Sequence, residues 1–125
     1  MTEVKHTTRM LRIAPRKLRL VADRVRYLEA EKAISILELV VNKGALMVQK
    51  SLKSAITNAT ALGLDPSSLV VQQVWCDEGP KLKRLVIHSR GRSAQIQKKY
   101  SHLNLVLKGE NKPKARLKAV KSSAE

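Results

Sequence analysis

Basic side chains are the residues of this sequence with the clearest chemical potential, and they gather in two segments. After Glu78 no acidic residue occurs before Glu110, and this basic stretch contains Lys81, Lys83, Arg84, Arg90, Arg92, Lys98 and Lys99. The second segment lies near the N-terminus and contains Arg9, Arg12, Arg16, Lys17 and Arg19. Lysine and arginine neutralise phosphates, and the planar arginine fork can also grip a phosphate through two hydrogen bonds. Both segments are therefore suited to binding a polyanion.

The charge balance of the whole chain points to the same kind of partner. There are 25 Lys and Arg residues against 10 Asp and Glu, which gives a formal net charge of +15. Nucleic acid is the first candidate and an anionic membrane surface the second. Aromatic residues make up only 2% of the chain, so Tyr27, Trp75 and Tyr100 are too few to form a stacking platform for single-stranded bases. This composition favours structured RNA, which proteins recognise mainly by its shape and backbone.

Two enzymatic or metal-binding alternatives deserve comparison with this interpretation. The adjacent carboxylates Asp77 and Glu78 resemble part of a metal-dependent nuclease site. However, neighbours on a strand point to opposite faces, which disfavours a shared metal. The spacing of His6, His88, His102 and Cys76 matches no zinc pattern, and one cysteine permits no disulfide within the chain. We therefore expect neither a catalytic site nor a cofactor or metal.

A membrane role is also disfavoured by the sequence. The longest apolar stretches are too short for a membrane-spanning helix, and residues 1–17 lack the apolar core of a signal peptide. The apolar stripes of the expected helices are rich in Ala and Val and carry no Trp or Phe anchors. We expect no targeting segment and no membrane partner, and cytoplasmic residence follows as the default.

Three amphipathic helices should form the first half of the chain. The first begins at Ala14-Pro15, with a proline where the first helical turn tolerates one, and buries Leu18, Val21, Ala22 and Val25. The second covers about 29–41, with Ala33, Ile34, Leu37 and Val41 on its apolar face. The third covers about 43–61 and should stop at Gly63. A short strand is expected over residues 3–8.

Two further strands and a long arm should form the second half. Residues 69–76 are rich in Val, with Trp75 expected in the core, and residues 101–107 alternate polar side chains with leucines. The 77–100 stretch between them is too long for a hairpin loop, so we expect an extended arm that continues both strands. Gly79-Pro80 should form a turn at its base and Gly91 a turn at its tip. A two-stranded arm cannot be stabilised by its own packing and needs an anionic partner.

These elements predict an α+β fold, in which three helices pack on a small antiparallel sheet with one long extended β-hairpin arm. We expect a single domain over residues 1–108, including the arm at about 77–100. Residues 109–125 should form a basic, flexible tail, because this segment is rich in Lys and Ala.

Three segments together resemble the bacterial-type large-subunit ribosomal protein twenty-two family. They are APRKLRLVAD at 14–23, LKSAITNA at 52–59, and DEGPKLKR at 77–84 followed by Arg90-Gly91-Arg92 and Ser101-His102. The resemblance covers roughly residues 3–108. It implies a small domain on the surface of the large ribosomal subunit, with a long hairpin that reaches into the large-subunit rRNA and ends in the nascent-peptide exit tunnel.

The resemblance also implies roles for individual residues and partners. Globular-domain rRNA contacts are expected from Arg9, Arg12, Arg16, Lys17 and Arg19, and arm contacts from Lys81, Lys83, Arg84, Arg90, Arg92, Lys98 and Lys99. The tunnel tip would comprise His88, Ser89, Arg90, Gly91 and Arg92. Here the sequence departs from the family, because Ile87-His88-Ser89 stands where many members carry a Pro-Arg-Ala type of segment. Expected partners are 23S-type rRNA during assembly, neighbouring large-subunit proteins and the nascent peptide, without homo-oligomers.

Other functions remain open at this point. A free-standing basic RNA- or DNA-binding protein, such as a chaperone or a nucleoid component, would show the same charge. A metal-dependent nuclease is a more distant alternative. A ribosomal protein should stay with rRNA in moderate salt, whereas a nucleoid protein should follow DNA and wash off. A nuclease should degrade RNA only in the presence of divalent metal.

Overall fold

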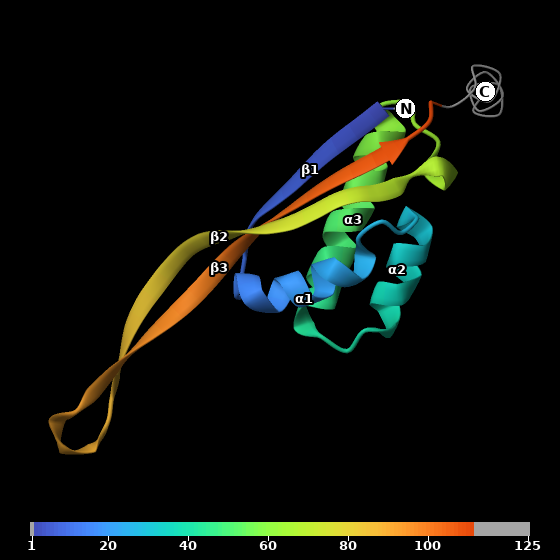
Figure 1. The fold of residues 1–125 in the computed structure, drawn as a ribbon. Coiled ribbons are helices and arrows are strands. Elements are labelled where there is room, and N and C mark those ends of the chain that lie inside the picture. Colours follow the sequence, from blue (N-terminus) through green and yellow to red (C-terminus); the bar gives the residue numbers. More distant parts are fainter. Residues whose placement is uncertain (1, 112–125) are drawn as a thin grey trace, which may run out of the picture.

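The order of helices and strands along the chain agrees with the expected one. The computed structural model describes residues 2–111, and its main elements are β1 (Thr2–Leu11), α1 (Pro15–Val25), α2 (Ala30–Leu39), α3 (Lys43–Ala61), β2 (Val70–Ile87) and β3 (Ser93–Gly109). Short 3-10 helices lie at Pro66–Ser68 (η1) and Ser89–Gly91 (η2). Figure 1 shows the helices gathered at one end of the molecule and the β2–β3 hairpin projecting from them. The predicted α+β fold is confirmed.

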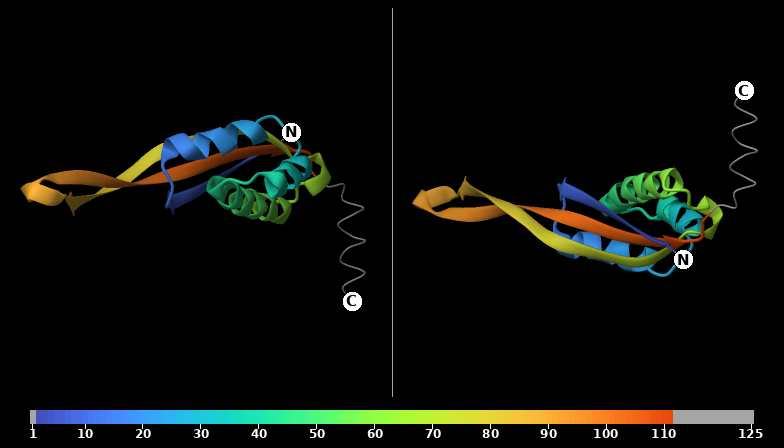
Figure 2. Two further views of the ribbon diagram at one scale, coloured as in Figure 1. Left: turned by 90° about the horizontal axis from the view of Figure 1, so that it is seen from below. Right: turned by 90° about the horizontal axis from the view of Figure 1, so that it is seen from above.

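The sheet is built around the last strand of the chain. Its order is β1-β3-β2, and both pairings are antiparallel. Leu103, Leu105 and Leu107 of β3 are fully buried, because alternate side chains of a strand point to one face. The helices cover this face, with α1 against β2 and α3 against β1, and none of the helices within residues 2–111 lies on the other face (Figure 2).

The helices follow their apolar stripes closely. In α1, Leu18, Val21 and Val25 are fully buried, and Pro15 occupies the first turn. The α2 helix ends at Leu39, earlier than predicted, because the backbone of Val40 is extended. Val41 is 97% exposed, so its predicted place on the apolar face is wrong. Gly63 lies just beyond α3 with a φ of +90°, as expected for a glycine that stops a helix.

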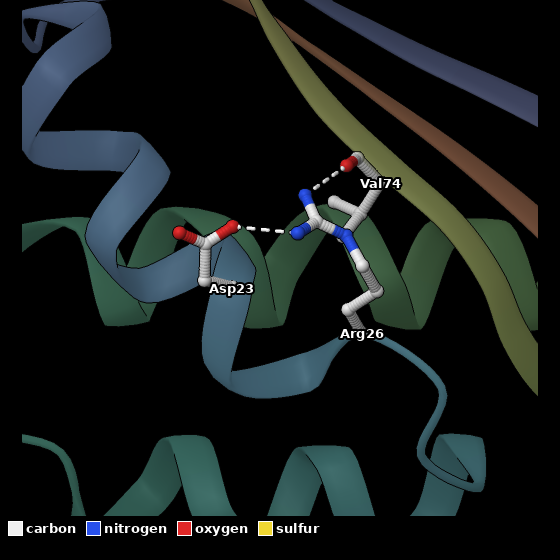
Figure 3. A network of polar contacts seen from close by, with 3 residues as sticks. All are labelled: Asp23, Arg26 and Val74. Carbon is white, nitrogen blue, oxygen red and sulfur yellow. Dashed lines mark hydrogen bonds and ion pairs between the residues drawn. The ribbon is translucent and has the colours of Figure 1, made fainter.

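The outer edge of β2 is covered by α1 and by the chain that follows it. The Leu28 carbonyl accepts from the Val71 amide at 2.8 Å, and the Tyr27 amide donates to the Val71 carbonyl at 2.9 Å. Further along the edge, Arg26 Nη2 donates to the Val74 carbonyl at 2.9 Å and Nη1 pairs with Asp23 at 2.8 Å (Figure 3). These contacts satisfy edge groups that would otherwise invite another strand.

The hairpin arm continues the sheet, as predicted. Pairing of β2 with β3 resumes at Lys81↔Lys99 and continues without a break to Ile87↔Ser93. The predicted turn at Gly79-Pro80 is wrong, because both residues lie inside β2 at an irregularity between Glu78 and Lys81. A Cβ on Gly79 would lie 3.0 Å from the carbonyl atoms of Tyr100. The glycine therefore permits a bulge with close backbone approach rather than a reversal of the chain.

Trp75 does not lie in the core, contrary to the prediction. Its neighbours Val74 and Cys76 are buried against the helices, whereas Trp75 is only partly buried and pairs with Asn104 on the open face of the sheet. The ammonium of Lys5 lies 5.4 Å from the centre of its ring. Such cation–π contacts are worth about 0.5–1 kcal/mol at exposed sites.

The end of the described chain is tied to the domain. We assigned residues 109–125 to the tail, but Gly109 still belongs to β3. The Glu110 carbonyl accepts from the Asp65 amide at 2.8 Å, and the Glu110 amide donates to Ser68 at 2.9 Å. The remainder of the predicted tail, 112–125, lies outside the described residues.

Candidate nucleic-acid interface

Every cation that the sequence analysis singled out is exposed. This holds for Arg9 on β1, for Arg12, Arg16, Lys17 and Arg19 at the start of α1, and for the arm residues Lys81, Lys83, Arg84, Arg90, Arg92, Lys98 and Lys99. On α1 the exposure follows from the helical period, because the apolar stripe turns inward and leaves the basic residues outside. On the arm it follows because no other element of the described chain packs against the two strands beyond the arm base.

The start of α1 and the base of the arm form a groove, which we call groove 1. Its volume is about 650 Å³ and it is lined by Arg12, Lys17, Lys43, Arg84, Lys98 and Lys99, together with apolar and aromatic atoms of Ile13, Leu82 and Tyr100. Lys43 also donates to the Arg12 carbonyl at 3.1 Å, which ties α3 to the start of α1. The structure therefore brings together cations that lie more than eighty positions apart in the sequence.

A second groove, groove 2, adjoins groove 1 at the base of the arm. Its volume is about 420 Å³, and its basic lining residues are Arg16, Arg19, Lys81 and Lys99. Lys99, Tyr100 and Ala14 line both grooves. The arm base is thus bordered by two adjoining basic grooves, and Tyr100 lines both of them.

One hydrogen bond fixes the geometry of both grooves. The Ser101 hydroxyl donates to the Ile13 carbonyl at 2.7 Å, and Ser101 is fully buried. This bond holds Ile13, two positions before α1, against the strand that carries Lys98 and Lys99. The cations of the helix and those of the arm are therefore placed relative to one another before any partner arrives.

Arg19 has a structural contact besides its place in groove 2. Its Nη2 atom donates to the Cys76 carbonyl at 3.0 Å, next to the Arg26–Val74 contact on the same strand edge. The guanidinium carries further donors, so this contact orients the group without exhausting it. From the sequence, Arg19 is predicted only as a nucleic-acid contact, and its bond to β2 is a finding of the structure.

The basic residues of the interface are not neutralised within the protein. Among residues 2–111 the ion pairs are Arg26–Asp23 and Lys32–Glu29. Neither pair involves a cation that lines groove 1 or groove 2. Because like charges gathered in grooves repel one another, their approach costs free energy in the absence of a partner. A phosphate backbone in the grooves would remove this cost.

The tip of the arm is a tight connection of three residues. The amide of His88 donates to the carbonyl of Arg92 at 2.7 Å, and Ser89–Gly91 form η2 between them. Arg90 and Gly91 have φ values of +62° and +70°. Gly91 therefore serves as the predicted turn glycine, and all side chains from His88 to Arg92 are exposed.

Sequence reasoning missed two cations. Lys43 lines groove 1 from the start of α3. In the sequence, only its position outside the apolar stripe of this helix indicates that its side chain is exposed. Lys5 lies on the open face of the sheet, beside Arg9 in a shallow hollow lined also by Asp77 and Asn104. No spacing in the sequence relates these four residues, because they come from three different strands.

The described residues give no support to the metal or nuclease alternatives. Residues 2–111 contain no cluster of three His, Cys, Asp or Glu side chains suited to a metal ion. Asp77 lines the open-face hollow and Glu78 lines groove 2, so the two carboxylates do face apart. Burial raises the pKa of the Cys76 thiol to about 11, against smaller opposing effects of Arg19 and Arg26. The raised pKa keeps the thiol protonated, and a protonated thiol is a poor nucleophile.

Within residues 2–111, no helix is long and apolar enough to cross a membrane.

Comparison with known proteins identifies the family. A family model described as Ribosomal protein L22p/L17e matches residues 6–108. The chain is 41% identical over 107 residues to "Large ribosomal subunit protein uL22" of Desulfosudis oleivorans, covering 86% of this chain and 94% of that protein. It is 40% identical over 108 residues to the protein of the same name from Magnetococcus marinus, covering 86% and 96%. The protein of that name from Desulfatibacillum aliphaticivorans is 39% identical over 105 residues, covering 84% and 97%.

The resemblance drawn from the three sequence segments is confirmed by these matches, as is the expectation of a structural rather than an enzymatic protein. The chain belongs to the Ribosomal protein L22p/L17e family.

Proposed function

We propose that this protein is a structural constituent of the large ribosomal subunit that binds and organises large-subunit rRNA in the cytoplasm. The observation that carries the proposal is the convergence of exposed, unpaired cations on the two grooves at the arm base. The names of the relatives, "Large ribosomal subunit protein uL22", support the same assignment. No catalytic step is part of this function.

The mode of binding follows from the arrangement of charge. RNA backbone lies in groove 1 and groove 2, where Lys and Arg replace condensed counterions around the phosphates. The two grooves adjoin at the base of the arm, so RNA bound in them holds the hairpin in place. Tyr100, between the grooves, is positioned to contact a base or ribose from either side. The arm gains from rRNA the lateral support that a two-stranded hairpin lacks.

The tip of the arm contributes to the wall of the nascent-peptide exit tunnel in this proposal. His88, Ser89, Arg90, Gly91 and Arg92 are exposed at the far end of the hairpin, away from the helices (Figure 1). The nascent peptide therefore meets a basic turn. The protein also contacts neighbouring large-subunit proteins, and it acts as a single copy without a membrane partner.

Gradient fractionation of a lysate, followed by a wash in high salt, tests the main proposal. We expect the protein to remain with the large subunit at one copy per rRNA after the wash. Sedimentation with DNA, or release into the free fraction, would show that the basic arm serves another polyanion. RNA degradation that requires divalent metal would instead point to a nuclease.

A pair of charge-matched variants tests the role of the grooves. Lys98→Glu/Lys99→Glu reverses two charges in the grooves, and Lys50→Glu/Lys53→Glu reverses two on the exposed side of α3. Both variants have the same net charge. We expect the first to lose incorporation into the subunit and the second to keep most of it. Equal loss would mean that only total charge matters.

A further inference from the structure

The open face of the sheet contains a polar hollow that is separate from the two grooves. It has a volume of about 470 Å³ and is lined by Lys5, Thr7 and Arg9 of β1, Asp77 of β2, and His102 and Asn104 of β3, with Met10 at its rim. The helices lie behind the sheet when it is seen from this side (Figure 2, right). The hollow is therefore accessible to a large partner.

A hydrogen-bonded row across the three strands fixes a carboxylate in this hollow. The Thr7 hydroxyl donates to Asn104 Oδ1 at 2.9 Å, and Asn104 Nδ2 donates to Asp77 Oδ2 at 2.9 Å. Asn104 is only 5% exposed. Because Thr7 orients the amide and the amide in turn holds the carboxylate, the position of Asp77 is set in advance of binding.

The carboxylate of Asp77 keeps unused capacity to accept hydrogen bonds. Within residues 2–111 it forms no ion pair, although Lys5 and Arg9 line the same hollow, and its Oδ1 atom accepts no hydrogen bond. A carboxylate accepts about four hydrogen bonds and donates none when ionised. An ordered acceptor that shares its hollow with two cations of β1 favours a ligand with both N–H donors and phosphates.

We propose that this hollow binds one unpaired guanine of the large-subunit rRNA, with Asp77 accepting hydrogen bonds from N1–H and the N2 amino group. Among the four bases, only guanine presents two adjacent N–H donors on its pairing edge, which match the two oxygens of a carboxylate. Lys5 and Arg9 contact the flanking phosphates. The inference rests on the proposed function, and it adds a base-specific contact to an interface otherwise based on backbone charge.

Chemical probing of the full chain bound to intact large-subunit rRNA tests this inference. Kethoxal modifies N1 and N2 of unpaired guanines, the same atoms that Asp77 would contact. The variants are Asp77→Asn and, as a control, Glu31→Gln. Each removes one negative charge from an exposed position, and Glu31 on α2 lines neither the grooves nor the hollow. The pair therefore separates loss of the Asp77 acceptor from a change in total charge.

We expect wild type and Glu31→Gln to protect one guanine that Asp77→Asn leaves reactive when all three proteins are present at concentrations that saturate the rRNA. Binding without any guanine that distinguishes Asp77→Asn from Glu31→Gln would overturn the inference and leave the proposed function intact. Absence of binding by wild type would instead refute the proposed function. In subunits isolated from cells that carry Asp77→Asn, loss of a neighbouring ribosomal protein without change in guanine protection would assign Asp77 to a contact with that protein and also overturn the inference.

A base substitution keeps the test independent of how the variant folds. Inosine lacks the N2 amino group of guanine, so a fragment of the protected rRNA with inosine at that position offers Asp77 one donor fewer. Wild-type protein should bind this fragment about tenfold more weakly than the guanine fragment, within the range for one base contact. Equal affinity of wild type for the two fragments would refute the contact.

Discussion

The hydroxyl of Ser101 donates to the carbonyl of Ile13 at 2.7 Å, and this bond links the base of the arm to the start of α1. Ser101 is fully buried and Ile13 is 7% exposed, so water cannot replace either partner. The bond lies behind both grooves, where the cations of α1 and the arm meet. A single buried contact therefore connects the stability of the fold to the shape of the interface.

Ser101→Ala should destabilise the protein by about 1–3 kcal/mol, because it leaves a buried carbonyl without its donor. Urea unfolding of wild type and variant measures the difference. Ser54→Ala on the exposed side of α3 is the matched control and should change the free energy of unfolding by about 0.5 kcal/mol or less. Equal effects of the two substitutions would show that the Ser101 bond contributes nothing specific.

Arg84→Gln should reduce the salt dependence of rRNA binding without abolishing binding. Arg84 lines groove 1 and belongs to no ion pair within residues 2–111. Loss of one phosphate contact should lower the slope of log affinity against log salt concentration by about 0.7–0.9. Filter-binding titrations at several salt concentrations give this slope.

Arg24→Gln is the control for this measurement. Arg24 is exposed in the last turn of α1 and lines neither groove. Its replacement by Gln removes the same charge as Arg84→Gln. Its slope should remain at the wild-type value. If both variants change the slope equally, the grooves have no special part in binding.

Amide exchange should divide β3 into two halves in the free protein. Lys98 and Lys99 are exposed in a two-stranded arm, whereas Leu103 and Leu105 lie in the buried centre of the sheet. Because local opening is easiest where few apolar contacts are lost, the amides of residues 81–99 should exchange faster than those of residues 103–107 and of α3. Addition of rRNA should slow exchange in the arm. Arm amides as slow as those of α3 in the free protein would contradict this expectation.

Much of the core could be predicted from periodicity, because Leu103, Leu105 and Leu107 alternate and the stripe of α1 repeats every three or four residues. Trp75 shows where this reasoning fails. Strict alternation from Val71 would turn Trp75 inward, but the register of β2 shifts between Val71 and Gln73 and turns Val74 and Cys76 inward instead. A bulge of this kind leaves no clear mark in the sequence.

The basic residues of the interface could be listed from the sequence, but their grouping could not. Lys43 and Lys98 share groove 1 only because α3, α1 and the arm base converge there. Likewise, no pattern reveals that Arg19 and Arg26 donate to the edge carbonyls of β2. Such contacts depend on tertiary structure, and composition only shows that donors are abundant.

The buried thiol of Cys76 should make stability fall at alkaline pH. Burial raises its pKa from the ordinary value of 9.0 to about 11. Between these values the folded chain keeps a proton that the unfolded chain has released, so the free energy of unfolding decreases as the pH rises. Below pH 9.0 the contribution is fully present, and it is lost as the pH passes the folded-state value of about 11.

Cys76→Ser isolates this effect, because serine does not titrate in that range while the lysines and tyrosines are common to both proteins. Urea unfolding at pH 8, 9, 10 and 11 gives two curves of stability against pH. The wild-type curve should fall more steeply than that of the variant above pH 9, whatever the difference between them at pH 8. Parallel curves would mean that the thiol ionises as readily in the folded protein as in the unfolded chain, and that water reaches Cys76 between α1 and β2.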